Sequence, residues 1–399
     1  MPSPKILVIN CGSSSIKFAL IDCEEKQPLA SGLAECLGSD NTQLKIKISH
    51  GSDIKRKLPG AQHKEALKAC IQDLKKILDD DFQLDGVGHR VVHGGEKFTN
   101  SCKLTEDLLN TLKECSDLAP LHNPANLTGI YTAQEIFPGI PQIAVFDTSF
   151  HQTMPPQAYL YATPYEFYEK YSLRRYGFHG TSHHYVAFET AKILNKAFSE
   201  TNIITIHLGN GCSVCSISNG QSVDTSMGLS PNEGLVMGTR SGDVDPSIFQ
   251  FLAEKENLSM TEVHNILNQK SGLLGISGLS NDMRTLIEAA HNGHSRAQLA
   301  LNIFCHRLSK SILSMTAGLD VLNAIVFTGG IGENAPYIRA QTILQLRLLQ
   351  IDIDPHLNDQ NGRTSKGYIT TKNSTIPALV VPTNEELMIA REATRLLKL

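Results

Sequence analysis

Short apolar runs separated by small-residue turns fill the first part of the chain. Residues 5–10 form one apolar run, a Cys-Gly-Ser-Ser-Ser turn follows at 11–15, and residues 16–21 form a second run. Runs of this length between turn signals are typical of buried strands. Residues 66–80 instead place leucine and isoleucine at helical spacing, which predicts an amphipathic helix. Two further buried strands are predicted at residues 87–92 and 143–146.

The same order of strand, turn and strand returns near the middle of the chain. Residues 203–207 are an apolar run, 208–213 are a turn of small residues, and 214–217 are a second run. When Asn10 is aligned with His207, the two patterns lie 197 residues apart, close to half of the 399-residue chain. This repeated order of strand, turn and strand predicts two similar halves. A chance match is the alternative, because the similarity is short.

A third apolar strand and glycine turn lie toward the C-terminus. The strand is predicted at 324–328, and the turn Gly-Gly-Ile-Gly-Glu-Asn follows at 329–334. A long helical pattern at 295–317 precedes them, and an amphipathic helix ending near Leu397 closes the chain. Since no low-complexity linker separates the halves, we expect an α/β protein whose two halves pack closely and leave a cleft between them.

The composition narrows the class of protein. A length of 399 residues suggests two or three domains, and 36 basic against 40 acidic residues give a formal charge of −4, which argues against a nucleic-acid partner. No apolar stretch reaches membrane-spanning length, and the N-terminus lacks the pattern of a signal peptide. The nine cysteines are scattered and odd in number, unlike a disulfide framework. We therefore expect a cytoplasmic protein with no membrane partner.

Three small-residue turns after apolar strands favour phosphate binding. Glycine and serine let backbone N–H groups approach phosphate oxygens closely. A single turn is weak support, because hairpins use the same residues. None of the three matches a Walker loop or a kinase glycine-rich loop, and the turn at 329–334 lacks the full dinucleotide-binding spacing.

Three cations accompany these turns. Lys17 lies just beyond the first turn, whereas Arg90 and Arg240 each lie in a glycine-flanked loop. A planar guanidinium in such a loop is suited to grip a carboxylate or phosphate. The alternative for each arginine is an ordinary surface residue.

Two further residues could take part in chemistry. Asp147 ends the strand at 143–146, where a capping or turn role is the favoured alternative. His179 is four residues before His183, but no glutamate follows it, which excludes an HExxH zinc site. His179 could instead donate to a developing phosphoryl charge, and a packed histidine is the alternative.

A possible capping box lies at the start of the last helix. Thr383 as the cap and Glu386 as its partner fit the required spacing, which would leave Glu385 free. A free carboxylate at a domain junction is suited to bind Mg²⁺, directly or through water. The alternative is a favourable interaction of Glu385 with the helix dipole.

Taken together, these segments resemble the signature segments of the acetate kinase family. The resemblance covers essentially the whole chain, and its motifs are long and specific; they lie at residues 10–17, 88–95, 176–183, 237–243, 329–334 and 383–386. It implies an α/β fold of two duplicated ribonuclease-H-like domains, as in actin, Hsp70 and sugar kinases, around a nucleotide cleft. It also implies a homodimer that reversibly transfers the γ-phosphoryl group of ATP directly to acetate.

The resemblance also implies roles for individual residues. For the metal and the donor, it implies Mg²⁺, replaceable by Mn²⁺, at Asn10 and Glu385, and an ATP contact at Lys17. For the acceptor, it implies acetate binding by Arg90. For catalysis, it implies acid/base catalysis by Asp147 and transition-state stabilisation by His179 and Arg240. For ATP or ADP, it implies a loop of His207, Leu208, Gly209, Asn210 and Gly211, a segment of Asp282, Met283 and Arg284, and a second loop of Gly330, Ile331, Gly332, Glu333 and Asn334. For the substrate methyl group, it implies an apolar pocket of Val92, Leu121, Phe178 and Pro231.

The expected domains are residues 1–149 with 385–399 on the acceptor side, and 150–384 on the nucleotide side. Because acetate is already ionised near neutral pH, we expect Asp147 to orient groups more than to abstract a proton. Asn232 stands where the family more often has an apolar residue, next to the expected pocket. The alternatives are a kinase for propionate or another short carboxylate, and a non-catalytic nucleotide-binding module of the Hsp70 kind.

Overall fold

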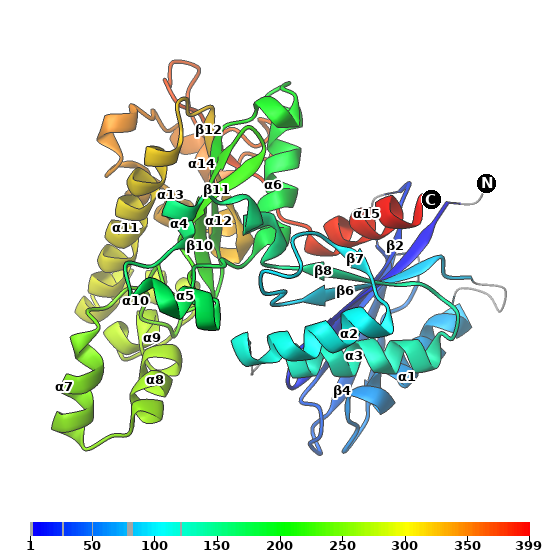
Figure 1. Ribbon diagram of the computed structural model, residues 1–399. Helices are drawn as coiled ribbons and strands as arrows, with labels where there is room; N and C mark the ends of the chain where they lie inside the picture. Colours follow the sequence, from blue (N-terminus) through cyan, green and yellow to red (C-terminus); the bar gives the residue numbers. More distant parts are fainter. Residues whose placement is uncertain (1–2, 26–27, 50, 78–82, 120–121) are drawn as a thin grey trace. The chain divides into compact units, whose positions relative to one another are not determined.

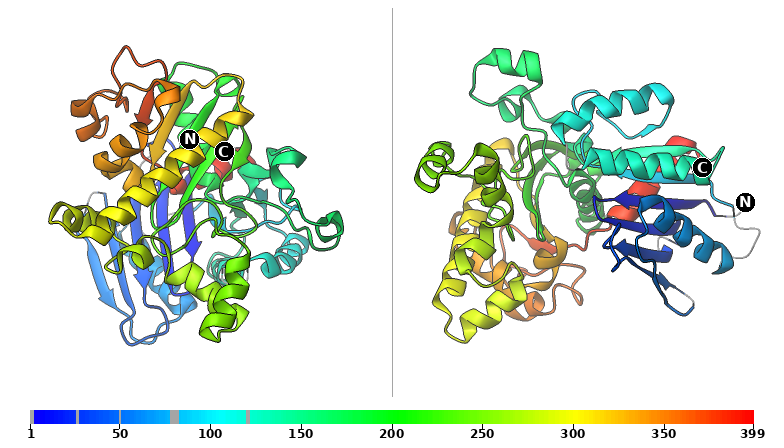
Figure 2. Two further views of the ribbon diagram at one scale, coloured as in Figure 1. Left: turned by 90° about the vertical axis from the view of Figure 1, so that its left-hand side faces the viewer. Right: turned by 90° about the horizontal axis from the view of Figure 1, so that it is seen from below.

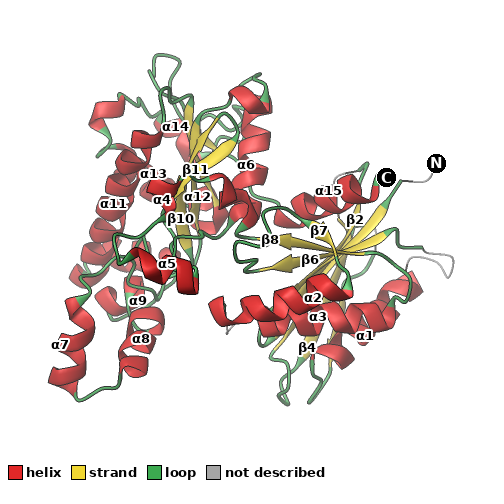
Figure 3. Ribbon diagram, viewed as in Figure 1, coloured by secondary structure: helices red, strands yellow, loops and turns green. Residues whose placement is uncertain are grey.

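The computed structural model describes the whole chain except residues 1–2, 26–27, 50, 78–82 and 120–121 (Figure 1). It divides into two compact units. Unit 1 comprises Met1–Phe150 and Asn384–Leu399, and unit 2 comprises His151–Thr383. The chain therefore returns to unit 1 for its last helix. Each unit contains one β-sheet with helices packed against it (Figure 3).

The sheet of unit 1 has eight strands in the order β5-β4-β3-β2-β1-β6-β8-β7. The first five form an antiparallel meander, β1, β6 and β8 are parallel, and the short β7 pairs antiparallel with β8. The strands are β1 (Lys5–Cys11), β2 (Ser15–Asp22), β3 (Pro28–Glu35), β4 (Gln43–Ile48), β5 (Ile54–Lys57), β6 (Gly86–Val91), β7 (Cys102–Lys103) and β8 (Gln142–Phe146).

The helices of unit 1 cover its sheet on two sides. Helices α1 and α3 pack together and against the strands, while α15 packs on β6, β1 and β2 (Figure 1). Because β1 is covered on both faces, it reads as a continuous apolar run rather than an alternating one. The α-helices are α1 (His63–Ile77), α2 (Glu106–Glu114), α3 (Asn123–Ile136) and α15 (Glu385–Leu397). The predicted helix at 66–80 is thus confirmed as α1, and the end of its predicted range lies outside the described residues.

The sheet of unit 2 has five strands in the order β11-β10-β9-β12-β13. The long helix α11 lies across this sheet, as Figure 2 shows on its left, and α6 packs on β9 and β12. The strands are β9 (Ile203–Leu208), β10 (Cys212–Ser218), β11 (Gln221–Thr225), β12 (Ala324–Thr328) and β13 (Ala378–Val380). The α-helices are α4 (Pro156–Tyr159), α5 (Tyr165–Tyr171), α6 (Gly180–Ile193), α7 (Ser247–Glu256), α8 (Met260–Gln269), α9 (Gly272–Ser277), α10 (Met283–His291), α11 (Ser295–Met315), α12 (Gly329–Asn334), α13 (Pro336–Ile343) and α14 (Pro355–Asp359).

The two sheets share one pattern, which confirms the predicted duplication. In unit 1, β1 pairs antiparallel with β2 and parallel with β6; in unit 2, β9 pairs antiparallel with β10 and parallel with β12. Asn10 lies opposite Lys17 and His207 lies opposite Ser213, and the turn of unit 2 is one residue shorter than that of unit 1. In each unit, a helix from later in the chain packs on the sheet. Helix α6, which comes after β8, α4 and α5, packs on the sheet of unit 2. Helix α15, which comes after β13, packs on the sheet of unit 1.

One predicted turn is a helix instead. Residues 329–334 form α12 rather than an open glycine turn. Gly329 has a φ of +77°, a left-handed conformation that suits glycine, and this residue starts the helix directly after β12. The Glu333 carboxylate then accepts a hydrogen bond from the Gly329 N–H at 3.0 Å, which satisfies a donor at the helix start.

A search of the described helices found none that combines the length and the apolar character needed to cross a bilayer.

Candidate active site

Arg90 is the centre of a charged cluster in unit 1. It lies near the end of β6, and Asp147 directly follows the neighbouring parallel strand β8, so the sheet brings the two together. Arg90 Nε donates to Asp147 Oδ1 at 3.1 Å, and Arg90 Nη2 donates to Asp147 Oδ2. Asn10 Oδ1, on β1, lies 3.4 Å from Arg90 Nη1. Three predicted site residues therefore meet on three adjacent strands.

Glu385 joins this cluster from the first turn of α15. Its Oε2 lies 3.7 Å from Arg90 Nε. Burial raises the pKa of Glu385, and although Arg90 opposes the shift, the nearby Asp147 and Glu386 add to it. Burial acts against the charged form of Arg90, but the two carboxylates raise the pKa of Arg90 above its ordinary value. The carboxylates therefore favour the charged form of Arg90, whereas burial favours the neutral form of Glu385.

The predicted capping box at Thr383 is wrong. The helix cap is Asn384, whose side chain accepts a hydrogen bond from the Leu387 N–H at 2.9 Å. Asparagine is as good a cap as threonine, and one residue of shift moves both glutamates into the first turn. Glu386 is therefore not held by a cap. Its Oε1 lies 2.5 Å from Lys17 Nζ on β2, which gives that lysine a carboxylate partner in unit 1.

The predicted pocket residues of unit 1 are only partly described. Val92 follows the end of β6 and is 9% exposed. Its N–H donates to Asn126 Oδ1 at 3.0 Å, and Asn126 Nδ2 donates to the Cys11 carbonyl at 2.7 Å. Asn126 on α3 thus fixes the chain after β6, a role that the sequence analysis missed. Leu121 lies outside the described residues.

His179 stands at the start of α6 in unit 2. It is the N-cap residue and has a φ of +58°, in the left-handed region. Its ring stacks on that of His207, with centroids 4.3 Å apart, and its Nδ1 lies 2.9 Å from Ser213 Oγ. His207 Nδ1 lies 2.8 Å from Ser182 Oγ, which in turn lies 2.8 Å from Thr383 Oγ1. Two predicted site histidines are therefore held face to face.

Arg240, like His179, lies beside Gly211 in the 209–211 turn. A Cβ built on Gly211 would be 3.3 Å from Arg240 Nη1 and 3.4 Å from His179 Nε2, so the glycine allows both side chains to approach the backbone. Arg240 Nη1 donates to the Pro231 carbonyl at 3.1 Å. Burial lowers the pKa of Arg240, and no carboxylate of the described residues forms an ion pair with it. Its positive charge is available to an anion.

The remaining pocket residues of unit 2 surround this point. Phe178 is 3% exposed, and its carbonyl lies 3.0 Å from His151 Nε2. Pro231 contacts Arg240 through its carbonyl oxygen. Next to it, the Asn232 Oδ1 atom is buried and has no hydrogen-bond partner among the described residues. Asn232 therefore presents a polar atom beside a residue of the expected apolar pocket.

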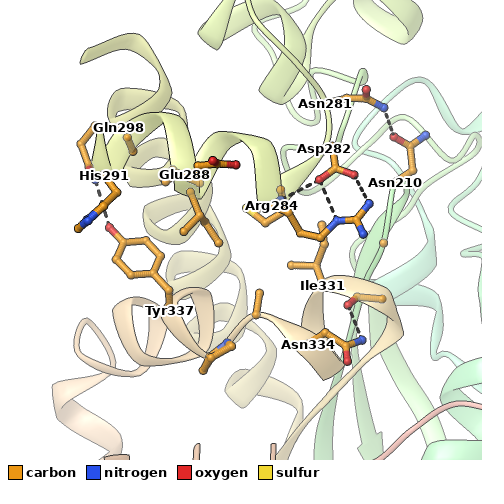
Figure 4. Close-up of a pocket in the computed structure, with 18 residues that line it drawn as sticks. Asn210, Asn281, Asp282, Arg284, Glu288, His291, Gln298, Ile331, Asn334 and Tyr337 are labelled. Carbon is orange, nitrogen blue, oxygen red and sulfur yellow. Dashed lines mark hydrogen bonds and ion pairs between the residues drawn. The ribbon is translucent and has the colours of Figure 1, made fainter. Parts of the chain in front are cut away.

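A cavity of about 1090 Å³ opens in unit 2 between α10, α12 and the start of α13 (Figure 4). Asn281 Nδ2 donates to Asn210 Oδ1 at 3.0 Å at one end, and Gln298 Nε2 lies 3.2 Å from the Tyr337 hydroxyl at the other. Eight predicted nucleotide residues line the cavity: Gly209, Asn210, Asp282, Met283, Arg284, Gly330, Ile331 and Asn334. Glycines at one end, in the 209–211 turn and in α12, together with apolar walls suit a nucleotide.

The other predicted nucleotide residues do not line this cavity. His207, Leu208 and Gly211 belong to the hairpin described above, and Gly332 is buried within α12. The Glu333 carboxylate accepts from the N–H groups of Gly329 and Thr383 and from the Thr328 hydroxyl group, so its contacts in the structure are with neighbouring protein groups.

Arg284 and Asp282 form an ion pair at the edge of the cavity. Arg284 Nη2 lies 2.7 Å from Asp282 Oδ2, and hydrogen bonding from Arg284 lowers the pKa of Asp282 to about 2. Asp282 also caps α10 by accepting from the N–H groups of Arg284 and Thr285. The carboxylate is thus fixed in place while the arginine remains largely exposed.

Two solved structures share the fold over nearly the whole chain. Acetate kinase of Porphyromonas gingivalis is 42% identical, has a TM-score of 0.92, and the match covers 99% of this chain and 100% of that one. A propionate kinase from Francisella tularensis subsp. tularensis is 47% identical, has a TM-score of 0.91, and the match covers 98% of each chain. With its two duplicated sheets, this chain has the fold of the actin, Hsp70 and sugar-kinase class.

The sequence comparisons define the family. The sequence model of the acetokinase family matches residues 5–391. The acetate kinase of Thermoanaerobacterium thermosaccharolyticum is 51% identical over 399 residues, and the match covers 99% of each chain. The chain belongs to the acetokinase family. It is accordingly a phosphotransferase with a carboxyl group as acceptor.

Proposed function

We propose that this chain transfers the γ-phosphoryl group of ATP reversibly to acetate, giving acetyl phosphate and ADP. The observation that carries the proposal is the fixed guanidinium of Arg90. Of its five N–H donors, Asp147 takes two and Asn10 takes one. Two N–H groups remain on the outer edge, which is the number that a carboxylate accepts in a bidentate pair.

A divalent cation is part of this proposal. Amide and carboxylate oxygens are the ligands that Mg²⁺ prefers, and Asn10 and Glu385 supply one of each beside Arg90. Burial favours the neutral form of Glu385, so an added cation there would stabilise its carboxylate. Asn10 and Glu385 would hold Mg²⁺ or Mn²⁺, and the ion would offset the negative charge of the phosphates.

The nucleotide is proposed to bind in the cavity of unit 2. Gly209 in its turn and Gly330 near the start of α12 suit phosphates, and the apolar walls suit a base. A volume of about 1090 Å³ is at the upper end of the range typical of small-molecule sites. Lys17, in unit 1, is proposed to contact ATP phosphates after exchanging its present partner, Glu386.

The chemistry requires placement and charge more than proton transfer. Acetate is ionised near neutral pH and attacks phosphorus directly, so Asp147 serves to hold Arg90 rather than to act as a strong base. Charge that spreads over the equatorial oxygens is stabilised by Arg240, which has no carboxylate counter-charge among the described residues, and by a hydrogen bond from His179. The acceptor carboxylate and the donor phosphate must be brought together for this step.

We also propose a cytoplasmic homodimer. The sequence resemblance supports the dimer, and nine free cysteines suit a reducing compartment. Sedimentation of the purified chain tests the dimer, since a monomer at micromolar concentration would contradict it.

The test of function is ADP release with acetate, propionate and butyrate, beside a reaction without acceptor. We expect the highest kcat/KM with acetate, a requirement for Mg²⁺, and little ADP release without acceptor. A higher kcat/KM with propionate would instead assign the chain to the propionate kinases, one of which shares its fold. Equal ADP release with and without acceptor would indicate a nucleotide-binding module.

A further inference from the structure

A chain of buried hydrogen bonds connects His179 to the interior of unit 2. His179 Nδ1 lies 2.9 Å from Ser213 Oγ on β10, and the same oxygen lies 2.8 Å from His183 Nε2 on α6. His183 Nδ1 lies 2.7 Å from Thr205 Oγ1 on β9. Ser213, His183 and Thr205 are completely buried. The geometry thus joins two imidazole rings and two hydroxyl groups in one line.

The surroundings of His183 favour its neutral form. Burial lowers the pKa of His183 well below its ordinary value, and the neighbouring His151 and His207 lower it further. A neutral imidazole has one N–H donor and one acceptor nitrogen, and a hydroxyl group has one hydrogen to donate. The protons along the chain can therefore run in one direction or the other. The remaining arrangement, in which both rings donate to Ser213, leaves the buried Ser213 hydroxyl hydrogen without an acceptor among the described residues.

Only one direction gives every buried donor between Thr205 and His179 an acceptor. If His179 donates to Ser213, Ser213 to His183 and His183 to Thr205, then the Thr205 hydroxyl hydrogen has no acceptor within the described part of the chain. If Thr205 donates to His183 Nδ1, His183 Nε2–H donates to Ser213, and Ser213 donates to His179 Nδ1, then each of these donors has an acceptor and the His179 Nε2–H stands at the end of the chain. Buried donors without an acceptor are costly, so the second order is favoured.

We propose that Thr205, His183 and Ser213 are positioning residues that hold His179 in its Nε2–H tautomer. His179 Nδ1 then accepts from Ser213, and the remaining N–H is presented beside Gly211 and Arg240. His179 can therefore donate to an anionic oxygen while it is neutral. The link to phosphoryl transfer rests on the proposed function, whereas the order of the protons is a property of this chain alone.

The direct test is the tautomer of His179 in the full-length protein. Histidine labelled with ¹⁵N distinguishes an Nδ1–H from an Nε2–H ring by its nitrogen shifts, and loss of one ring signal in His179→Gln assigns it. At pH 8 without substrate we expect Nε2–H rings for both His179 and His183. An Nδ1–H ring at either position would overturn the proposal, whatever reaction the protein catalyses.

Substitutions then test whether the order matters for turnover. In metal sites, the partners behind a histidine ligand contribute roughly 10- to 100-fold to affinity or activity, and we take the lower end of that range for the partners of His179. We therefore expect Ser213→Ala to lower kcat by roughly 10-fold or more, with a smaller change in KM, and to show a second, Nδ1–H population of His179. Ser216→Ala is the matched control, because Ser216 lies on the same strand and its buried Oγ has no partner among the described residues.

Thr205 offers a test at a distance from the site. Thr205→Val removes the first donor of the chain but keeps the side-chain shape, whereas Thr205→Ser keeps the hydroxyl group. We expect the valine variant to lower kcat and the serine variant to restore most of it. Equal kcat values for the two variants, with the wild-type tautomer in both, would mean that Thr205 only fills space and would overturn its assignment.

Discussion

The first hairpin of each unit has the same frame but different side chains. In unit 1, β1 and β2 pair Asn10 with Lys17, and around them lie Arg90, Asp147 and the glutamates of α15. In unit 2, β9 and β10 place His207 opposite Ser213, and their neighbours are His179 and neutral hydroxyl groups.

The same backbone frame thus carries two different sets of side chains, suited to different groups. The hairpin of unit 1 concentrates charges of both signs, which suits a carboxylate and a metal ion. The hairpin of unit 2 combines neutral hydrogen-bond donors with Arg240, whose charge has no carboxylate partner among the described residues, and this suits a phosphoryl group.

The largest effect is expected from removing the charge beside the second hairpin. Arg240→Ala should lower kcat/KM by roughly 100- to 1000-fold, because it removes a preorganised cation from the developing phosphoryl charge. Arg395→Ala is the control, since Arg395 forms an exposed pair with Glu392 on α15. The measurement is acetyl phosphate formation. Comparable rates for the two variants would remove Arg240 from the account.

The metal requirement separates the two glutamates of α15. Glu385→Gln should raise the Mg²⁺ concentration needed for half-maximal rate, because it replaces an expected ligand. Glu386→Gln should instead leave the Mg²⁺ requirement nearly unchanged and should not raise the KM for ATP, since it frees Lys17 from the carboxylate that this lysine must leave to contact ATP. A Mg²⁺ titration that gave the reverse order would show that Glu386 is the ligand.

The two turn glycines give a smaller, matched contrast. A methyl group on Gly211 would lie 3.3 Å from Arg240 Nη1 and 3.4 Å from the His179 ring, so Gly211→Ala should displace one of them and lower kcat roughly tenfold. In unit 1, a methyl group on Gly12 would meet Ser15 Oγ at 3.2 Å, which a rotation of that hydroxyl relieves. Gly12→Ala should change kcat by less than about twofold. A larger effect at Gly12 would refute the contrast.

The smallest effect concerns acceptor preference. Val92→Ala should raise the ratio of kcat/KM for propionate to that for acetate by about tenfold, because pockets discriminate one methylene by roughly 1–3 kcal/mol. Within a strand, side chains two residues apart point to the same face of the sheet. Because β6 ends at Val91, this rule does not by itself place Val92 on the same face as Arg90. An unchanged ratio would exclude Val92 as a wall of the acceptor pocket.

The sequence predicted the frame well because strands and helices leave local patterns. The apolar runs at β1, β2, β9 and β12 lie within a residue or two of their predicted positions. Asn10 and His207, which the predicted repeat aligns, each lie near the end of the first strand of a hairpin and pair with the strand that follows. Membership of the acetate kinase family was also predicted and is confirmed. The expected domain boundary after residue 149 is one residue from the division at Phe150.

Contacts between distant residues could not be predicted in the same way. Ser213, His183 and Asn126 support the site through hydrogen bonds that span 30 to 115 residues, and no local pattern reports them. The Thr383 capping box failed because Asn384, one residue later, is an equally good cap. Ser213 takes the place of Lys17 in the observed pairing, but the 197-residue offset aligns Lys17 with Val214, because the second turn is one residue shorter.

The central claim is that Arg90 of unit 1 binds the acceptor while unit 2 binds the nucleotide. Phosphorus NMR of ATP, Mg²⁺ and acetate with the full-length protein, combined with calorimetric titration of ADP, measures both parts. The account predicts an acetyl phosphate signal with the wild type, a loss of at least about 100-fold in its rate of formation with Arg90→Ala, and the same ADP affinity in both proteins. Acetyl phosphate formation at the wild-type rate by Arg90→Ala, or a large loss of its ADP affinity, would contradict the claim.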